Sequence, residues 1–583
     1  MGTAKDKLKA LWQDRRPGKI RLPLAALSAF TFVFTFILFG PCEIYITNIQ
    51  EMTFPFRAMV LTLLLFGAFV FVLLFGLLIL LRGKIFNYAM SILFAVTFAG
   101  YLQGNFLSLN SGSLDGNAVD WLNYKPSMLT GLLLWLLILV AVFMLLYLSR
   151  KAWSQCIRLV SVILIATQLI ALVVILVDAD AGRVWRAGQD QYVSRDSIYE
   201  IAPKNNVIVF LLDRMDNRYM DEELKLHPDW ADRLGDFTYY HNFTGSYANT
   251  RPAITYLFTG VQHDYSVPWE KYFKKAWEEP VYTLLPDIHN AGYQTHIYTE
   301  GPYVFDRAQN VEEFVDNIDS SRRKVNYPEL LKRVMDLSVY RYAPEIFRPF
   351  FHIYTGDLGN IVSVEGGETE NDIYMLDDVT FWREYKEQGL RINQDSQGLF
   401  LLYHLNGAHT PYCMDENAQE LSADEGATLD SQVTGNMNMI FQYMDRLKEL
   451  GLYDDTTIII TTDHGRPPRA TGDFSAVSDS RVCTLLIKPA GVHGEGPMKV
   501  SHKQVCQDDL RASIASYFGL DTSAYGPTIE SIGEDEDRIR YVWMRGERGD
   551  VYNILFTFKI TGDANDFSNW ELIGETEMKY PGL

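Results

Sequence analysis

The stretch TTIIITTDHG at residues 456–465 is an apolar, β-branched run that ends on Asp463 and His464. A run of this length and composition predicts a short buried strand. Three further runs in the second half of the chain have the same character: NVIVFLLD (206–213), QTHIYTE (294–300) and GLFLLYHL (398–405). The first of these three also ends on a carboxylate, Asp213.

Helical patterns separate the predicted strands. They lie near residues 251–260, 280–291, 327–340, 376–389 and 429–451. This alternation predicts an α/β domain with a mainly parallel sheet that helices cover on both faces. In such folds ligands bind beyond the carboxyl ends of the strands. After about residue 538 closely spaced strands follow, and these predict a small antiparallel part.

A hydroxyl joins the two carboxylates and the imidazole as a candidate for chemistry. Thr250 lies in SYANTRPAITYLFTG (246–260), at a predicted helix start with Pro252 in the first turn. Taken singly, a strand-end Asp or a Thr before Arg-Pro is explained as a helix cap. Taken together, Asp213, Thr250, Asp463 and His464 suit one divalent cation, Zn²⁺ or Mn²⁺, which also activates the hydroxyl.

The Thr250 segment resembles the nucleophile motif of the alkaline-phosphatase/sulfatase superfamily, Cys/Ser-x-Pro-Ser-Arg followed by Leu-x-Thr-Gly. Thr250 takes the nucleophile position, and Pro252, Leu257 and Thr259-Gly260 follow at the family's spacing. Asp213 and Asp463-His464-Gly465 are similar to the family's other metal-binding segments. The resemblance covers roughly residues 204–530, and it implies a sulfatase-like catalytic domain.

The chain resembles one group of this superfamily most, the membrane-anchored lipoteichoic-acid synthases and phosphoethanolamine transferases. HLNGAHTPY (404–412) is similar to their His-bearing segment. This implies that His409 binds or protonates the leaving or entering oxygen, while His404 is expected to pack at a strand end. Arg251 can clamp phosphate oxygens or remain a solvated surface residue. Both interpretations stay open.

The resemblance implies a membrane-bound, metal-dependent phosphotransferase. It would move a phospholipid headgroup, glycerol phosphate or phosphoethanolamine, to an envelope glycan or lipid through a phospho-Thr intermediate. Sulfate-ester hydrolysis fits less well, because sulfatases make their formylglycine from Cys or Ser and the motif's Arg is Ile254 here. A hydrolase of the same fold, phosphodiesterase or sulfatase, remains the alternative. A non-catalytic membrane scaffold is a third interpretation, which the intact Asp/Thr/Asp-His set opposes.

Five apolar segments precede this domain, each long enough to span a bilayer. They run approximately over residues 22–46, 58–81, 86–107, 127–149 and 157–178. The organisation expected is a five-helix transmembrane domain (1–180), a juxtamembrane linker (181–203), the catalytic domain (204–537) and the C-terminal antiparallel appendage (538–583).

Charge predicts the orientation. The N-terminal tail and the loops at Arg82-Lys84 and at Arg150-Lys151 are basic and are therefore expected in the cytoplasm. The chain is therefore expected to be a multi-pass protein of the cell membrane. Because the number of spans is odd, the catalytic domain is expected on the extracytoplasmic side. Glu43, near the outer end of the first span, either contacts a lipid headgroup or lies in the wet interface.

Composition excludes one class of partner and leaves one question open. The formal net charge is −20, which opposes a general affinity for nucleic acid. The chain has five cysteines, of which Cys413, Cys483 and Cys506 lie in the soluble part. One disulfide among these three is open from the sequence alone.

Overall fold

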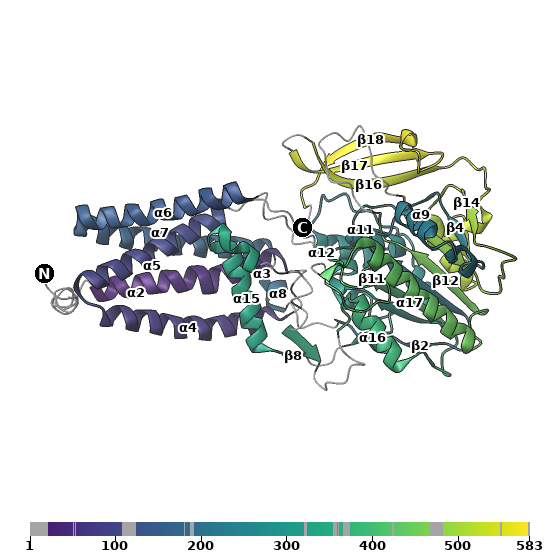
Figure 1. The fold of residues 1–583 in the computed structure, drawn as a ribbon, viewed down its shortest axis with the longest axis horizontal. Coiled ribbons are helices and arrows are strands. Elements are labelled where there is room, and N and C mark those ends of the chain that lie inside the picture. The colour runs from purple at the N-terminus through teal and green to yellow at the C-terminus, as the bar shows by residue number, and fades with distance from the viewer. Residues whose placement is uncertain are drawn as a thin grey trace. The chain divides into compact units, whose positions relative to one another are not determined.

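The structure is a computed structural model of the whole chain. It describes residues 21–580 apart from 50–51, 53, 108–123, 180, 187–191, 320–322, 352, 354–357, 359–360, 365–372, 423–424, 466–481 and 549–550. The chain divides into two compact units (Figure 1). Unit 1 comprises Met1–Gln189 and Arg323–Ser363, and unit 2 comprises Asp190–Arg322 and Val364–Leu583.

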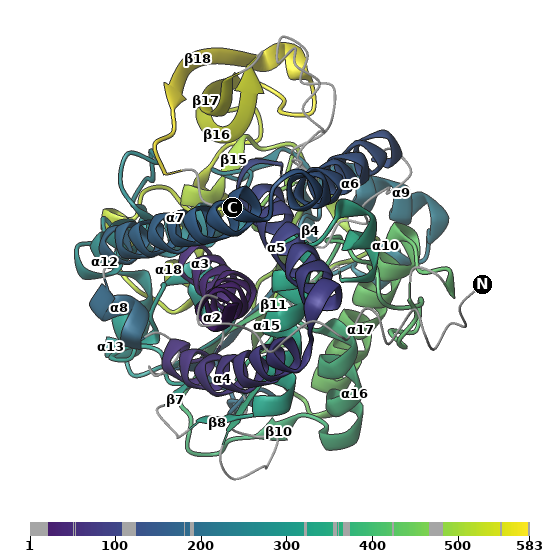
Figure 2. The same ribbon diagram turned by 90° about the vertical axis from the view of Figure 1, so that its left-hand side faces the viewer.

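Unit 1 contains the five predicted apolar helices. The first is built from α2 (Arg21–Val33), the π-helical turn η1 (Phe34–Phe39) and α3 (Gly40–Thr47). The others are α4 (Phe56–Leu80), α5 (Gly83–Phe106), α6 (Lys125–Leu148) and α7 (Arg150–Asp178), and the short α8 (Ala181–Arg186) follows. All five are long and apolar enough to cross a membrane, which confirms the prediction of five apolar helices of spanning length. Figure 2 views unit 1 from the end of this bundle.

A segment from the middle of the soluble sequence completes unit 1. It carries β8 (Arg323–Val325), α15 (Tyr327–Tyr342) and the 3₁₀ helix η3 (Glu345–Phe350). β9 (Val362–Val364) follows at its end and pairs with β8. From the sequence, all of residues 204–537 was expected in the catalytic domain. The predicted helix at 327–340 does form, but its apolar face packs on α3, α4 and α5. Helical periodicity reveals an apolar face but not the body that covers it.

Tyr342 anchors this segment in a notch made by glycines of the spans. Its side chain is 1% exposed. A Cβ at Gly40 would lie 2.7 Å from the Tyr342 ring, and one at Gly104 would overlap that ring. Only glycines at these positions let the aromatic side chain approach the helix backbones so closely.

This notch predicts opposite effects for two Gly→Ala substitutions in neighbouring spans. Gly104→Ala should destabilise unit 1 by about 1–3 kcal/mol, because the added methyl group overpacks the Tyr342 ring. Gly76→Ala should be neutral or slightly stabilising, because nothing lies within 4 Å of a Cβ there and alanine favours the helix. Thermal unfolding of the two purified variants in one detergent checks this. Equal midpoints for both variants would contradict the notch.

The core of unit 2 is a mixed sheet of seven strands in the order β14-β4-β13-β12-β3-β11-β6. Its centre is parallel: β3 (Asn206–Leu212) pairs with β11 (Leu399–Leu405) and β12 (Thr456–Thr461), and β11 pairs with β6 (Gln294–Tyr298). These are the four strands predicted from the sequence. The edge strands β4 (Thr238–Tyr240), β13 (Leu485–Lys488) and β14 (Lys499–Ser501) were not predicted, and β13 runs antiparallel to its neighbours.

Helices cover both faces of this sheet, as the contacts of β11 show. Successive side chains of a strand point to opposite faces, so Phe400 and Tyr403 lie on different sides. Phe400 packs edge-to-face against Phe258 of α11 (Thr250–Thr259), and Tyr403 against Tyr443 of α17 (Leu429–Glu449). The remaining main helices of unit 2 are α9 (Asn217–Leu226), α12 (Trp269–Glu278), α13 (Leu284–Asn290), α16 (Asp378–Gln388) and α18 (Gln507–Tyr517).

The chain ends in the predicted antiparallel sheet. β16 (Ile539–Arg548), β17 (Val551–Thr561) and β18 (Trp570–Glu577) pair in that order around a small apolar core of their own. All five cysteines lie in the described part of the chain and none is part of a disulfide, so Cys413, Cys483 and Cys506 do not form the bond that the sequence left open.

Candidate metal and nucleophile site

Two parallel strands deliver the acidic residues to one edge of the sheet. Asp213 directly follows β3, and Asp463 and His464 lie two and three residues after the end of β12. Because β3 and β12 are neighbours in parallel register, their carboxyl ends meet. Asp213, Asp463 and His464 each offer a ligand atom, and these atoms all lie within 4.8 Å of one another.

Thr250 completes the group from a helix N-terminus. It begins α11, and its Oγ1 lies 3.4 Å from Nε2 of His464. The same Nε2 lies 3.6 Å from Oδ1 of Asp213 and 3.5 Å from Oδ2 of Asp463. The structure therefore brings together the four residues that the sequence placed at a metal site, although they are spread over two strands and a helix.

The cluster is buried and has unpaired acceptors. Asp213, Asp463 and His464 are each less than 5% exposed. Oδ1 of Asp213 and Oδ2 of Asp463 have no hydrogen-bond partner among the described residues. Buried carboxylate oxygens are normally satisfied, and a cation is one of the partners that can satisfy them. Two carboxylates, one imidazole and one hydroxyl thus form a donor set that fits a divalent ion such as Zn²⁺ or Mn²⁺.

The two carboxylates differ in their acidity. Burial, and after it the neighbouring Asp463 carboxylate, raises the pKa of Asp213 well above its usual value. Burial alone would also raise the pKa of Asp463. The imidazoles of His464 and His404 and a hydrogen bond from Thr250 oppose that effect, and the pKa of Asp463 is lowered. A pair of buried carboxylates with divided pKa values is typical of a functional site.

A loop after β11 fixes the Asp213 backbone. Asp213 donates its N–H to the Leu405 carbonyl, and the Asp213 carbonyl accepts from Ala408 N–H. Gly407 between them has φ +57°, and a Cβ there would lie 2.5 Å from the Asp213 nitrogen. The buried Asp378 carboxylate holds this loop by accepting from the N–H groups of Asn406 and Gly407. The loop thus needs glycine for the close approach that positions the metal-ligand candidate.

His409 follows on the same loop. Its Nδ1 lies in hydrogen-bond contact with the Thr410 carbonyl, so Nδ1 carries the proton and Nε2 is left as an acceptor. Burial, followed by the positive charge of Arg214, lowers the pKa of His409 to about 3. The imidazole is therefore neutral at pH 7 and accepts, rather than donates, at Nε2.

Arg251 lies beside the nucleophile candidate but faces aromatic rings. The side chain is 8% exposed, so it is not the solvated arginine that the sequence left open. Its guanidinium carbon lies 5.6 Å from the centroid of the Trp269 ring and 5.0 Å from that of Tyr303. These cation–π contacts fix Arg251 at the start of α11.

Three residues near the cluster were missed from the sequence. His404 was expected to pack at a strand end, yet its Nε2 lies 3.9 Å from Oδ2 of Asp213 and its Nδ1 lies 3.0 Å from Oγ1 of Thr299. Burial lowers the pKa of His404 to about 4. The charges of Arg214 and Glu300 also act on Asp213. Arg214 follows Asp213 directly and Glu300 follows β6, so their place just beyond a strand end was the available signal.

Comparison with known proteins gives one match by sequence and several by structure. The sequence model of the sulfatase family matches residues 205–520. No curated protein matches the chain. Similar solved structures include a protein in the alkaline phosphatase superfamily from Vibrio parahaemolyticus, with 14% identity, a TM-score of 0.37, and coverage of 66% of this chain and 85% of that chain.

Two further solved structures are similar to about the same degree. Phosphonate monoester hydrolase from Silicibacter pomeroyi has 14% identity and a TM-score of 0.36, with 65% of this chain and 90% of that chain covered. The lipoteichoic acid synthase LtaP from Listeria monocytogenes has 13% identity and a TM-score of 0.35, with 67% and 87% covered.

Proposed function

Because the chain belongs to the sulfatase family, we propose that it is a membrane-bound, metal-dependent phosphotransferase that moves a phospholipid headgroup to an envelope acceptor. The headgroup would be glycerol phosphate or phosphoethanolamine, and the acceptor an envelope glycan or lipid. The observation that carries this proposal is the place of the Thr250 hydroxyl, at a helix N-terminus and 3.4 Å from the imidazole of the Asp/Asp/His cluster.

One divalent ion, Zn²⁺ or Mn²⁺, would be held by Asp213, Asp463, His464 and the Thr250 oxygen. When bound, such an ion lowers the pKa of a coordinated hydroxyl and neutralises developing negative charge. The N–H groups at the start of α11 add a further site for phosphate oxygens. Arg251, which follows Thr250 and is held by aromatic neighbours, would contact those oxygens as well.

The reaction proceeds in two displacements at phosphorus. Thr250 Oγ1 attacks the phosphorus, the bond from phosphorus to the diacylglycerol oxygen breaks, and diacylglycerol leaves with a proton. An acceptor hydroxyl then attacks the phospho-Thr250 phosphorus, and the Thr250 oxygen is released and reprotonated. Since His409 is neutral with a free Nε2, it serves the second step by accepting a hydrogen bond from the entering hydroxyl.

Water in place of the acceptor hydroxyl would make the same site a phosphodiesterase. A sulfatase is disfavoured because position 250 is Thr, whereas formylglycine arises from Cys or Ser. The transferase is preferred because five apolar helices tether the site where phospholipids are concentrated.

Product analysis tests the proposed function. The purified full chain in lipid nanodiscs receives phospholipids labelled in the headgroup, with Thr250→Ala as the control. A transferase releases diacylglycerol and attaches the label to an added glycolipid or glycan acceptor. Label appearing only as free headgroup phosphate assigns the hydrolase instead. Cleavage of aryl sulfate with no attack on any phospholipid rejects the phosphotransferase.

The proposal also requires unit 2 to lie on the outer side of the membrane. Two exposed positions test this, each replaced by Cys: Lys151 in the first turn of α7, next to the basic connection from α6, and Asp521 in unit 2. An impermeant thiol reagent should label Asp521→Cys in intact cells and Lys151→Cys only after permeabilisation, since basic loops stay in the cytoplasm. The wild-type protein, treated in parallel, gives the background from native thiols. Labelling of Lys151→Cys in intact cells would reverse the assigned orientation.

A further inference from the structure

Residues 323–363, here called the docking segment, interrupt the sequence that matches the sulfatase family yet belong to unit 1. Helix α15 of this segment is capped at its N-terminus: the Asn326 side chain accepts a hydrogen bond from Glu329 N–H, and Pro328 occupies the first turn. It ends at Tyr342, two residues before Pro344, which prevents its continuation. Figure 1 shows α15 running across the end of the helix bundle rather than along it.

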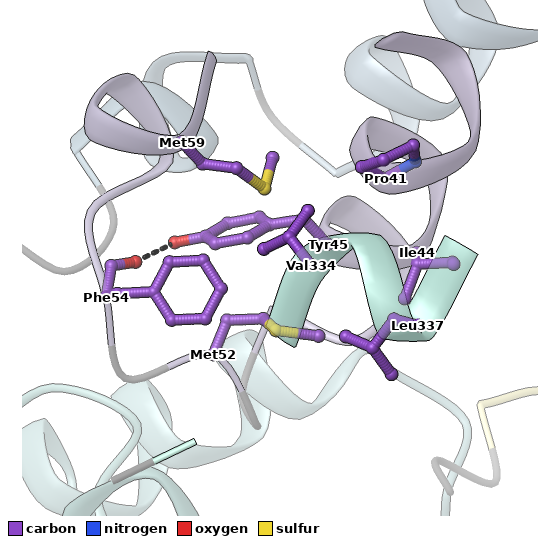
Figure 3. A pocket seen from close by; sticks show the side chains of 8 residues that line it. All are labelled: Pro41, Ile44, Tyr45, Met52, Phe54, Met59, Val334 and Leu337. Carbon is purple, nitrogen blue, oxygen red and sulfur yellow. Dashed lines mark hydrogen bonds between the residues drawn. The ribbon is translucent and has the colours of Figure 1, made fainter. Parts of the chain in front are cut away.

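The inner face of α15 is apolar. Val334 and Leu337 are buried and line a small pocket together with residues of the spans and of the stretch between α3 and α4 (Figure 3). The only polar side chain there is Tyr45, whose hydroxyl donates to the Phe54 carbonyl at 2.6 Å. This face is therefore already covered by the spans.

Polar contacts fix the register of the segment on the spans. Arg341 Nη2 lies 2.5 Å from Oε1 of Glu43, and the Tyr342 hydroxyl donates to Oε2 of Glu43 at 3.0 Å. Glu43 thus pairs within the chain, so the lipid-headgroup contact, one of the two alternatives that the sequence left open, is not needed to satisfy it. The Glu43 side chain is only 14% exposed, so breaking these contacts would leave its carboxylate poorly solvated.

A second set of contacts fixes the position of the segment along the axis of span α5. Gln103 Nε2 donates to Oε1 of the buried Glu345 at 3.2 Å, and Trp135 Nε1 donates to Gln103 Oε1 at 3.3 Å. Gln103 lies three residues before the end of α5, which is about 4.5 Å along the helix axis. The 3₁₀ helix η3, which begins at Glu345, therefore lies at the level where the span ends.

The outer face of η3 is uncovered and apolar. Ile346, Phe347 and Phe350 are 39%, 47% and 79% exposed. η3 packs on α6, whose Leu129 and Leu133 are themselves 59% and 65% exposed. η3 thus carries exposed apolar side chains and packs against a span that has exposed leucines of its own. Exposed Phe and Leu side chains are typical of elements that lie in the lipid–water interface.

We propose that η3 inserts Ile346, Phe347 and Phe350 into the lipid–water interface of the bilayer, which makes the docking segment a second membrane attachment of the catalytic chain. The partner is the phospholipid surface itself. The proposal requires only that unit 1 is embedded in a bilayer, and it stands apart from the reaction catalysed by unit 2. Both ends of the segment lead into unit 2, so unit 2 would be tied to the membrane at three points of the chain.

Site-directed fluorescence in proteoliposomes tests this. The full chain carries Phe350→Cys or Phe347→Cys labelled with a nitrobenzoxadiazole fluorophore. Leu133→Cys, on the exposed side of α6, is the lipid-facing control, and Asp521→Cys, exposed in unit 2, is the aqueous control. Wild-type protein sets the background labelling of native thiols. The vesicles contain phosphatidylcholine and phosphatidylglycerol, with or without lipids that bear a nitroxide near the glycerol.

The labels at 350 and 347 are expected to lose fluorescence with nitroxide lipids as Leu133→Cys does, and to resist quenching by aqueous iodide. Quenching by iodide without quenching by nitroxide lipids, the behaviour expected of Asp521→Cys, overturns the proposal. Shielding from both quenchers also overturns it, because a protein surface would then cover η3.

Discussion

Thr250→Ala is expected to lower turnover of a phospholipid substrate by roughly three orders of magnitude or more, because it removes the hydroxyl that lies 3.4 Å from Nε2 of His464 in the Asp/Asp/His cluster. The residual rate comes from the metal and from binding alone. The loss should appear in kcat, since Thr250 contributes to the chemical step. Initial rates of diacylglycerol release, measured with the wild type and the variant at equal metal loading, check this.

The matched control is Thr250→Ser, which keeps the hydroxyl and should retain a substantial part of the activity. Metal content and thermal unfolding show that both variants fold. A Thr250→Ala enzyme within about tenfold of the wild type contradicts a covalent role for Thr250, because loss of a nucleophile costs far more than that.

Asp463→Asn weakens divalent metal binding by at least about a hundredfold and abolishes activity with it. The amide keeps the shape of the side chain but removes the charge of an oxygen, Oδ2, that has no hydrogen-bond partner among the described residues. Titration calorimetry with Zn²⁺ and Mn²⁺ measures the change without reference to turnover. Asp521→Asn, at an exposed position of the same unit, should bind metal as the wild type does. Unchanged affinity in Asp463→Asn would remove Asp463 from the metal site.

Metal affinity should also fall in acid, and the pKa of Asp213 sets the direction. Burial and Asp463 raise the pKa of Asp213, so its carboxyl takes up a proton at a higher pH than an exposed Asp would. A protonated carboxyl cannot hold the cation, and each step down in pH through that pKa therefore weakens binding. Calorimetry at several pH values should show affinity decreasing from neutral pH downward, with proton release on binding. Affinity independent of pH would exclude Asp213 as a ligand.

The parts of the fold with a strong local sequence signal were predictable from the sequence. The five apolar helices are long apolar runs, the four central strands are runs of five to seven residues rich in apolar and β-branched side chains, and both appear where they were expected. The edge strands β4, β13 and β14 have three, four and three residues, too few to show an alternation. Their place in the sheet depends on neighbours that are distant in the chain.

The candidate site, too, was predictable only in part. Asp213, Thr250, Asp463 and His464 lie at strand ends and a helix start, and parallel topology alone brings such positions together. His404 was assigned to packing because a histidine within an apolar run has no signal of its own. Its closeness to Asp213 comes from the parallel pairing of β3 with β11. The docking segment was expected in the catalytic domain but belongs to unit 1. The sequence did not reveal this because Tyr342 and the glycines that it contacts lie more than 200 residues apart in the chain.

The central claim is that Thr250 becomes covalently linked to the phosphoryl group of a lipid donor in a metal-dependent step. Mass analysis of the Thr250 peptide tests it most directly. The purified full chain is mixed with Zn²⁺ or Mn²⁺ and headgroup-labelled phospholipid in the absence of an acceptor, then quenched in acid and digested. The peptide containing Thr250 is expected to gain the mass of the headgroup phosphate. Chelation should prevent the gain, and Thr250→Ala should lack it. An active, metal-loaded enzyme in which the label is found on another residue, or on no residue at any time during turnover, would contradict it.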